Sequence, residues 1–403
     1  MRRKEQNPVV LKRDLSEPLT VPEAAIDRAV EIMRSGRLFR YGEFTAGQSE
    51  VAALEREFAV YLESRYAVAM NSCGSTMFVA LKCAGVGPGD RVLVNAFTLA
   101  PVPGAIEHVG AQPMFLECGN DCRLDLADLE LRARKGAAKV LLISHMRGHI
   151  ADLEAVNDIC RRYGVLVIED CAHTMGASWK GRLTGTFGSM ACFSLQTFKH
   201  VNAGEGGLLI TDDDDLAAKA ILFSGSYMFY DQNGTRPSAE VFERYRQRIP
   251  NCSLRMPELT AALARPQIEL LSSRAAQWKR LYSLLAELFD EIEQVRVPCR
   301  PAEEDFVPSS IQFSLEGIDA QRIEAVLDAC GRQGVDIKWF GRATPLGFTS
   351  CWEHWQYVRK VEALPRTRRM LDTLCDMRIP LTLTPEDCRV IADILREAIL
   401  AID

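Results

Sequence analysis

The sequence has no apolar run of the length that a membrane span needs, which is about 20 residues in a helix. It also lacks an excess of positive charge, because its formal net charge is -6, so neither nucleic acid nor an anionic membrane is favoured as a partner. The basic start Met1–Lys4 is followed by polar residues rather than by the apolar core of a signal peptide. These absences predict a cytoplasmic protein.

Regularly paired cysteines are missing too, although the chain has 13 cysteines. The closest pair, Cys118 and Cys122, has no second pair and no histidine near it, and others such as Cys192 lie inside apolar segments. Free cysteine packs as a small apolar side chain. We therefore expect reduced, buried thiols and no metal site.

What is present is the composition of an ordinary globular protein, with 403 residues, 47% hydrophobic and 25% charged. Amphipathic helices are predicted over Val21–Ser35 and Ser49–Leu62. Short runs that are apolar throughout then alternate with helical segments, which is typical of strands covered on both faces. These runs are Ala67–Met70, Val92–Val94, Met114–Leu116, Val140–Ile143, Val165–Ile168, Ala191–Phe193 and Leu208–Ile210.

The pattern predicts an α/β fold, in which a three-layer αβα large domain holds a mostly parallel seven-stranded sheet. From about Thr260 the pattern is helical to Leu288, and short strands follow at Ser310–Leu315 and Val335–Trp339. We expect a smaller α+β C-terminal domain there. The predicted boundaries are 1–259 for the large domain, with its N-terminal helical segment, and 260–403 for the small one.

One lysine stands apart from the other charges. Lys199 lies in the stretch Cys192–Gly207, which begins as an apolar run and ends in a glycine cluster. Burial lowers the pKa of a lysine, and a neutral amine can form a Schiff base. From these residues alone, the alternative is a lysine at a strand edge whose amine reaches solvent.

Polar groups follow three other strands, at the edge where ligands bind in open parallel sheets. Asn71–Thr76 leads into a helix, so it forms either an anion site or a plain N-cap turn. Asp170 ends another strand, where its carboxylate either holds a cationic heterocycle or caps a helix. Asn95–Leu99 places a side chain over a ring or in the core. Pyridoxal phosphate needs four things together: a site for its phosphate, an acid beside its ring nitrogen, an amine for its aldehyde and a side chain that covers its ring.

These residues resemble the sugar aminotransferases of the DegT/DnrJ/EryC1/StrS family, pyridoxal-phosphate enzymes of the aspartate aminotransferase fold type. The resemblance runs from about Arg34 to Leu271. Its most specific parts are Val167–His173, which matches the family's VIED-x-A-Q/H, and Ser194 followed five residues later by Lys199 and then by Gly204–Gly207.

The resemblance implies a role for each matching residue. Lys199 would be the Schiff-base lysine and the proton carrier, Asp170 the partner of the pyridine nitrogen, and His173 the neighbour of the phenolic oxygen. The phosphate site would be formed by Ser194 with Gly74 and Ser75. The resemblance also implies a cytoplasmic homodimer with active sites at the subunit interface.

Three positions depart from the family pattern. Gly74 stands where a threonine is usual, and Leu99 stands where an aromatic residue commonly stacks on the cofactor. Ser253 stands where the partner subunit normally lends an asparagine, and Asn251 lies two residues earlier. Some members have a histidine in place of the lysine and catalyse a dehydration, but the spacings of Lys199 from Ser194 and from Glu205 disfavour that reading.

The predicted reaction moves an amino group from L-glutamate or L-glutamine to a carbonyl of a sugar-type acceptor, a nucleotide-linked ketosugar or a sugar acid. Arg147 and Lys338 lie in segments that diverge from the family and would bind an anionic group of that substrate, or else form structural ion pairs. A cyclitol or another cyclic ketone is the alternative acceptor. The alternative of a different class is a non-catalytic, cofactor-binding regulatory sensor.

Overall fold

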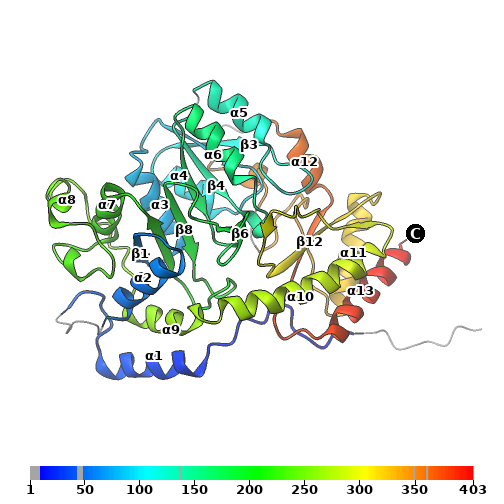
Figure 1. The fold of residues 1–403 in the computed structure, drawn as a ribbon. Coiled ribbons are helices and arrows are strands. Elements are labelled where there is room, and N and C mark those ends of the chain that lie inside the picture. Colours follow the sequence, from blue (N-terminus) through cyan, green and yellow to red (C-terminus); the bar gives the residue numbers. More distant parts are fainter. Residues whose placement is uncertain (1–9, 43–48, 137, 348–349, 360–361, 403) are drawn as a thin grey trace, which may run out of the picture.

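The computed structural model describes residues 10–42, 49–136, 138–347, 350–359 and 362–402 (Figure 1). Met1–Lys4, on which the expectation about a signal peptide rests, lie outside these residues. No described helix is long and apolar enough to cross a membrane. All 13 cysteines are free, and all except Cys252 and Cys299 are buried, which agrees with their expected packing.

A seven-stranded sheet forms the centre of the molecule (Figure 1). Its order is β1-β9-β8-β5-β4-β2-β3, and only β9 runs antiparallel to its neighbours. The seven predicted strands and the mostly parallel sheet are therefore confirmed. The strands are β1 (Tyr66–Met70), β2 (Arg91–Asn95), β3 (Gln112–Leu116), β4 (Val140–Ser144), β5 (Leu166–Asp170), β8 (Met190–Ser194) and β9 (Gly207–Thr211).

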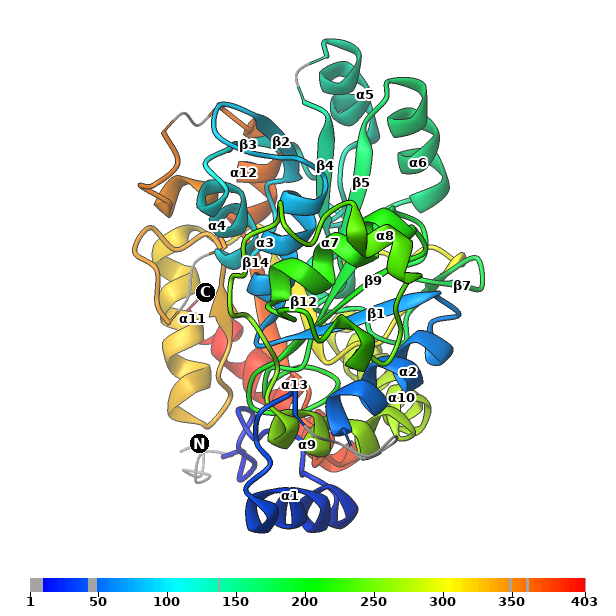
Figure 2. The same cartoon turned by 90° about the vertical axis from the view of Figure 1, so that its left-hand side faces the viewer.

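Helices cover both faces of this sheet, because the strands are apolar on both sides (Figure 2). In β4, for example, Leu142 packs in one core cluster and its neighbours Leu141 and Ile143 pack in another. Helices α3 (Cys73–Cys83), α4 (Pro101–His108) and α7 (Asp214–Ser224) cover one face, and α2 (Glu50–Tyr61), α5 (Leu126–Arg134) and α6 (Leu153–Arg162) cover the other. The three-layer prediction is confirmed.

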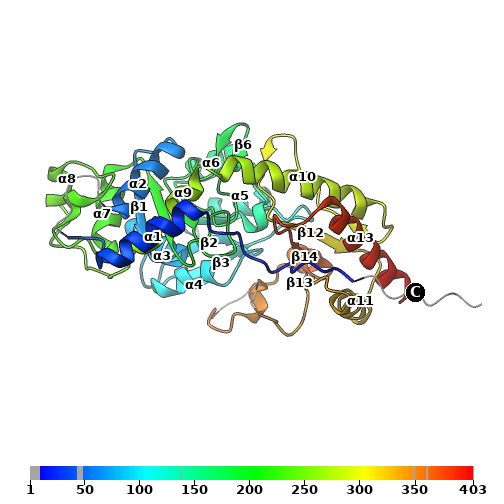
Figure 3. The same ribbon diagram turned by 90° about the horizontal axis from the view of Figure 1, so that it is seen from below.

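The N-terminal part of the chain connects the two halves of the molecule. Helix α1 (Glu23–Ser35) ends at Gly36, which has a φ of 69°, and packs on α9 (Glu258–Ile268). Residues 10–20, which precede α1, run along the C-terminal part, where the amide of Leu11 donates to the carbonyl of Gln333 (Figure 3).

The C-terminal part is built on a second, four-stranded sheet of order β10-β12-β14-β13. Its strands are β10 (Val295–Arg296), β12 (Ser310–Leu315), β13 (Lys338–Trp339) and β14 (Leu374–Arg378), and its helices are α10 (Leu271–Asp290), α11 (Ala320–Arg332) and α13 (Pro385–Leu400). The strand expected over Val335–Trp339 is shorter than predicted, and β14 was not predicted. One core cluster contains residues of both sheets, so the division at 259/260 stays a prediction.

The two faces of this smaller sheet differ in polarity. Ile311, Phe313, Trp339, Cys375 and Met377 pack in the apolar core. The alternate positions are polar, and Asp376 lies directly opposite Lys338 and Gln312 on the neighbouring strands. Since successive side chains of a strand point to opposite faces, Arg378 shares the face of Asp376.

The remaining elements are short. They are β6 (Ser178–Trp179), β7 (Arg182–Leu183), β11 (Glu304–Asp305), α8 (Ala239–Glu243), α12 (Pro365–Leu371) and the 3₁₀ turns Met146–Gly148, Tyr230–Gln232 and Trp352–His354.

Candidate active site

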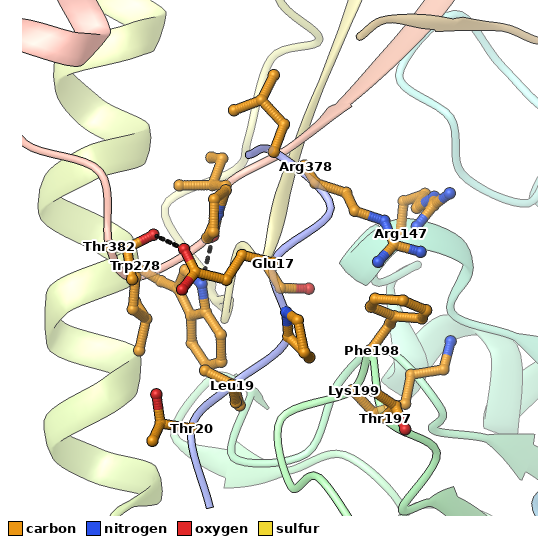
Figure 4. A pocket seen from close by; sticks show the side chains of 16 residues that line it. Glu17, Leu19, Thr20, Arg147, Thr197, Phe198, Lys199, Trp278, Arg378 and Thr382 are labelled. Atoms are coloured by element: carbon orange, nitrogen blue, oxygen red, sulfur yellow. Dashed lines mark hydrogen bonds between the residues drawn. The ribbon is translucent and has the colours of Figure 1, made fainter. Parts of the chain in front are cut away.

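Lys199 lies in the loop between β8 and β9 and lines a pocket (Figure 4). Burial lowers the pKa of its amine to about 8, and the positive charge of Arg147 acts in the same direction, whereas Asp170 raises it. For a pKa of about 8, about a tenth of the amine is neutral at pH 7 and about half at pH 8. The structure excludes the alternative of an amine that reaches freely into solvent.

His173 contacts the amine directly, with its Nε2 2.6 Å from Nζ of Lys199. It lies in the segment that follows β5 and is buried. Burial and the charge of Lys199 hold the pKa of its imidazole well below the usual range, so the ring is neutral. A neutral ring nitrogen can accept a hydrogen bond from the amine.

Asp170 is held in one orientation by its neighbours. Its Oδ2 accepts a hydrogen bond of 2.8 Å from the hydroxyl of Ser144, and its Oδ1 accepts one of 3.1 Å from the amide of Ala172. Ser144 is positioned in turn by Asn95, whose Oδ1 accepts from its amide at 2.8 Å. Ser144 was not singled out in the sequence, although a hydroxyl residue at the end of the apolar run was a usable signal.

Glu169, which directly precedes Asp170 in β5, has a structural role. Glu169 is fully buried, and its two oxygens accept hydrogen bonds from the amides of Gly185, Phe187 and Gly188. Glu169 also lies with His145 and Cys171 in a buried group whose ligand atoms are within 4.8 Å of one another. Because the carboxylate oxygens already accept three amide protons, this group supports no metal proposal.

The turn before α3 is a polar N-terminus. Ser72 caps the helix by accepting from the amide of Ser75 at 3.0 Å, and the two hydroxyls lie 2.9 Å apart. The first amides of a helix have no partner inside it, so this end attracts anions. Gly74 lies in the first turn of the helix, with room for a Cβ whose nearest neighbour would be the Ser72 hydroxyl at 3.7 Å.

Ser194 is brought to this turn by the pairing of strands. It is buried and lies opposite Gly207 in the β8–β9 ladder. A Cβ on Gly207 would lie 2.5 Å from the carbonyl atoms of Ser72, so only glycine allows β9 to approach the turn this closely. Ser194 is thus connected through Gly207 to the turn that holds Gly74 and Ser75, and the phosphate site of these three residues stays a prediction.

Two predicted residues, Leu99 and Ser253, are not among the residues that line the pocket of Lys199. Leu99 is partly buried in the turn between β2 and α4. Ser253 is exposed, and its amide and hydroxyl both donate to Oδ1 of Asn251, at 2.9 Å and 3.2 Å. Its chain neighbours Cys252 and Leu254 border an open hollow that Ser72, Gly74 and Ser75 also line.

Arg147 and Lys338, which come from opposite parts of the chain, meet around Asp376. Nη2 of Arg147 lies 2.7 Å from Oδ2 of Asp376, and Lys338 faces Asp376 across the β13–β14 ladder. The structural ion pair considered for Arg147 therefore exists. The pocket also contains Phe198 and Arg378, which were not singled out in the sequence (Figure 4).

The comparisons with known proteins agree with this geometry. The model of the DegT/DnrJ/EryC1/StrS aminotransferase family matches residues 23–396. The chain belongs to this family. As a member, it is a pyridoxal-phosphate-dependent aminotransferase, and the resemblance found in the sequence is confirmed.

Individual relatives extend this result to both halves of the chain. This chain is 29% identical over 300 residues to the spore coat polysaccharide biosynthesis protein SpsC of Bacillus subtilis, and the match covers 72% of this chain and 73% of that protein. It is 32% identical over 258 residues to the GDP-perosamine synthase of Caulobacter vibrioides, covering 63% and 64%. The solved structure of DesV from S. venezuelae is similar with a TM-score of 0.74 at 25% identity, covering 93% of each chain.

The residues of the site fit the cofactor. A primary amine of lowered pKa, a fixed carboxylate and a helix N-terminus face the same sheet edge, and these match an aldehyde, a ring nitrogen and a phosphate. The close approach at Gly207 leaves no room for a side chain between β9 and the α3 turn.

Proposed function

We propose that the protein transfers an amino group from L-glutamate or L-glutamine to a carbonyl of a sugar-type acceptor, with Lys199 as its reactive amine. The observation that supports this most is the amine of Lys199, partly buried, of lowered pKa and 2.6 Å from a neutral histidine. The names of SpsC and the GDP-perosamine synthase support a sugar-type acceptor.

Each residue has a proposed part in this reaction. Pyridoxal phosphate, when bound, supplies an aldehyde that takes up the amino group and a ring that withdraws electrons. Lys199 moves the proton at the reacting carbon, since its amine is neutral for much of the time near pH 8. Asp170 would hold the proton on the ring nitrogen, and the hydrogen bond from Ser144 keeps its carboxylate in one orientation.

The other predicted residues bind and orient. The α3 turn with Gly74 and Ser75, together with Ser194, holds the phosphate, and Leu99 covers the ring. His173 would lie beside the phenolic oxygen of the bound cofactor, and its contact with Lys199 positions the amine. Arg147, which lines the pocket, and Lys338, which lies beyond it on β13, bind an anionic part of the substrate.

We also propose that the protein works as a homodimer in which Ser253 or Asn251 reaches the partner's phosphate site. The exposed position of Ser253 supports this, as do the exposed side chains of Tyr227, Met228 and Phe229 on the preceding segment. A molar mass in solution of twice that of the chain is the expected result. An enzyme that is active as a monomer would contradict it.

The proposed activity can be tested in two stages. The purified yellow protein should lose its colour on addition of L-glutamate or L-glutamine and release the corresponding 2-oxo acid. A screen of ketosugars, sugar acids and cyclic ketones should then restore the colour with one class of acceptor. Colour that persists with every amino donor would contradict transamination and favour a cofactor-binding sensor.

A further inference from the structure

Arg378 is the feature of the pocket that the proposed function leaves unused. It ends β14, two residues after Asp376, and therefore points to the same polar face of the small sheet. Figure 4 shows its guanidinium extending toward that of Arg147, above Phe198 and Lys199. The residue comes from the far end of the chain, yet it lines the same pocket as the reactive amine.

The side chain of Arg378 is held in a defined position. Its Cζ lies 3.7 Å from the centroid of the Phe198 ring, so the guanidinium stacks on the residue that directly precedes Lys199. Stacking occupies the face of a guanidinium and leaves the N–H groups on its edge available for a planar acceptor.

The charges around Arg378 do not balance. Asp376 is buried and is already shared between Nη2 of Arg147 at 2.7 Å and the side-chain amide of Gln312 at 2.7 Å. Within the described part of the chain, no carboxylate forms a salt bridge with Arg378. Burial and the positive charge of Arg147 lower the pKa of Arg378, and Asp376 only partly offsets them. Two guanidinium groups thus lie close to one carboxylate, that of Asp376, whereas the other carboxylate that lines the pocket, Glu17, accepts from the hydroxyl of Thr382 at 2.9 Å. An anion bound between the two guanidinium groups would relieve their repulsion.

We propose that Arg378, together with Arg147, binds a carboxylate on the amino acceptor. This inference rests on the proposed function, because it names the chemical class of the acceptor at the same site. Asp376 is a positioning residue, since it holds Arg147 through the ion pair and is itself fixed by Gln312.

The charge count favours a single carboxylate over a nucleotide diphosphate. Asp376 pairs with Arg147, which leaves the guanidinium of Arg378 without a salt bridge among the described residues. Lys338 lies across the β13–β14 ladder from Asp376 and is not among the residues that line this pocket. One guanidinium without a salt-bridge partner matches one carboxylate, whose planar oxygens suit a guanidinium edge.

The test measures binding of two matched neutral and acidic sugars to the holoenzyme by calorimetry. Methyl β-D-glucuronide and methyl β-D-glucoside differ only in the carboxylate, and neither has a free aldehyde that could react with Lys199. The wild type should bind the glucuronide about 10-fold to 100-fold more tightly than the glucoside, as expected for hydrogen bonds to a charged group. In Arg378→Met, which keeps the aliphatic part, most of this preference should be lost.

Two further variants show whether the effect is specific. Arg378→Lys keeps the charge without the planar stack on Phe198 and should retain part of the preference. Arg389→Ala removes an exposed arginine of α13 that pairs only locally with Glu386, and should bind both sugars as the wild type does. Thermal unfolding of each variant checks that the fold is kept.

Several results would overturn the proposal. They are equal binding of the two sugars by the wild type, an unchanged preference in Arg378→Met, and an effect of that variant on UDP but not on the glucuronide, which would assign Arg378 to a diphosphate. A loss confined to the reaction with L-glutamate would assign Arg378 to the donor. The colour change of the wild type with L-glutamate needs no acceptor, so its failure would speak against the proposed function and not against the carboxylate site.

Discussion

The hydroxyl of Ser144 donates a 2.8 Å hydrogen bond to Oδ2 of Asp170, and so links the ends of two adjacent parallel strands, β4 and β5. Asn95 extends the link to β2, because it accepts from the amide of Ser144 and donates to its carbonyl. The proposed ring-nitrogen partner is therefore oriented by three strand ends.

Ser144→Ala should lower kcat because the carboxylate of Asp170 loses one of its two hydrogen bonds and becomes less well aimed. Loss of such a supporting partner typically costs about 10-fold to 100-fold. Asp170→Asn should cost more, since it removes the charge itself. Steady-state kinetics of the two variants checks the order, and a Ser144→Ala enzyme as impaired as Asp170→Asn would contradict it.

Gly207→Ala should weaken cofactor binding and lower the melting temperature. The added Cβ would lie 2.5 Å from the carbonyl atoms of Ser72 and would push β9 away from the α3 turn. Gly87→Ala is the control, because its Cβ would meet nothing within 4 Å and the residue lies outside the proposed cofactor site. Titration of the apoprotein with pyridoxal phosphate measures both; equal losses would show that the close approach at Gly207 is unimportant.

Arg147→Met should raise the pKa of Lys199, since the nearby positive charge that disfavours the ammonium form is removed. In the apoprotein, acylation of Lys199 followed by mass spectrometry should show a midpoint near pH 8 for the wild type and a higher one for the variant. Arg389→Met serves as the control for a distant charge. A midpoint that does not move would refute this electrostatic role of Arg147.

Lys338→Met should change how stability depends on pH. The folded-state pKa of Lys338 is about 7, below the value of about 10.4 in an unfolded chain. Between these values the unfolded state binds more protons, so the contribution of Lys338 to stability rises with pH, by at most about 1.4 kcal/mol per pH unit and less because the group is partly exposed.

The variant should therefore gain stability over the wild type chiefly at pH 7 and below, and the gain should shrink toward pH 10. Urea unfolding at several pH values measures this difference. Parallel stability curves for the two proteins would rule out the lowered pKa.

The large sheet could be predicted from the sequence because each of its strands contains a short run that is apolar throughout, as in Val140–Ile143, and most of these runs are followed by a helical segment. The same reading located Lys199, Asp170, Ser194 and the α3 turn, since each follows a strand and such ends meet at one edge. The spacing of Lys199 from Ser194 also distinguished it from His200.

The far side of the pocket could not be predicted in the same way. Strand β14 reads Leu374-Cys375-Asp376-Met377-Arg378, and its two charged residues face the pocket only because the alternate residues pack in the core. Which polar face meets the strand ends of the large sheet depends on tertiary packing, and so does the meeting of Arg147 with Asp376. The local pattern of apolar and polar residues in the sequence predicts neither of these contacts.

The central claim, that Lys199 is the reactive amine, can be tested by reducing the yellow holoenzyme with borohydride and mapping the modified peptide by mass spectrometry. The account predicts a pyridoxyl group on Lys199 and none in Lys199→Ala. A pyridoxyl group on another lysine of the wild type, or no stable modification at all, would contradict it.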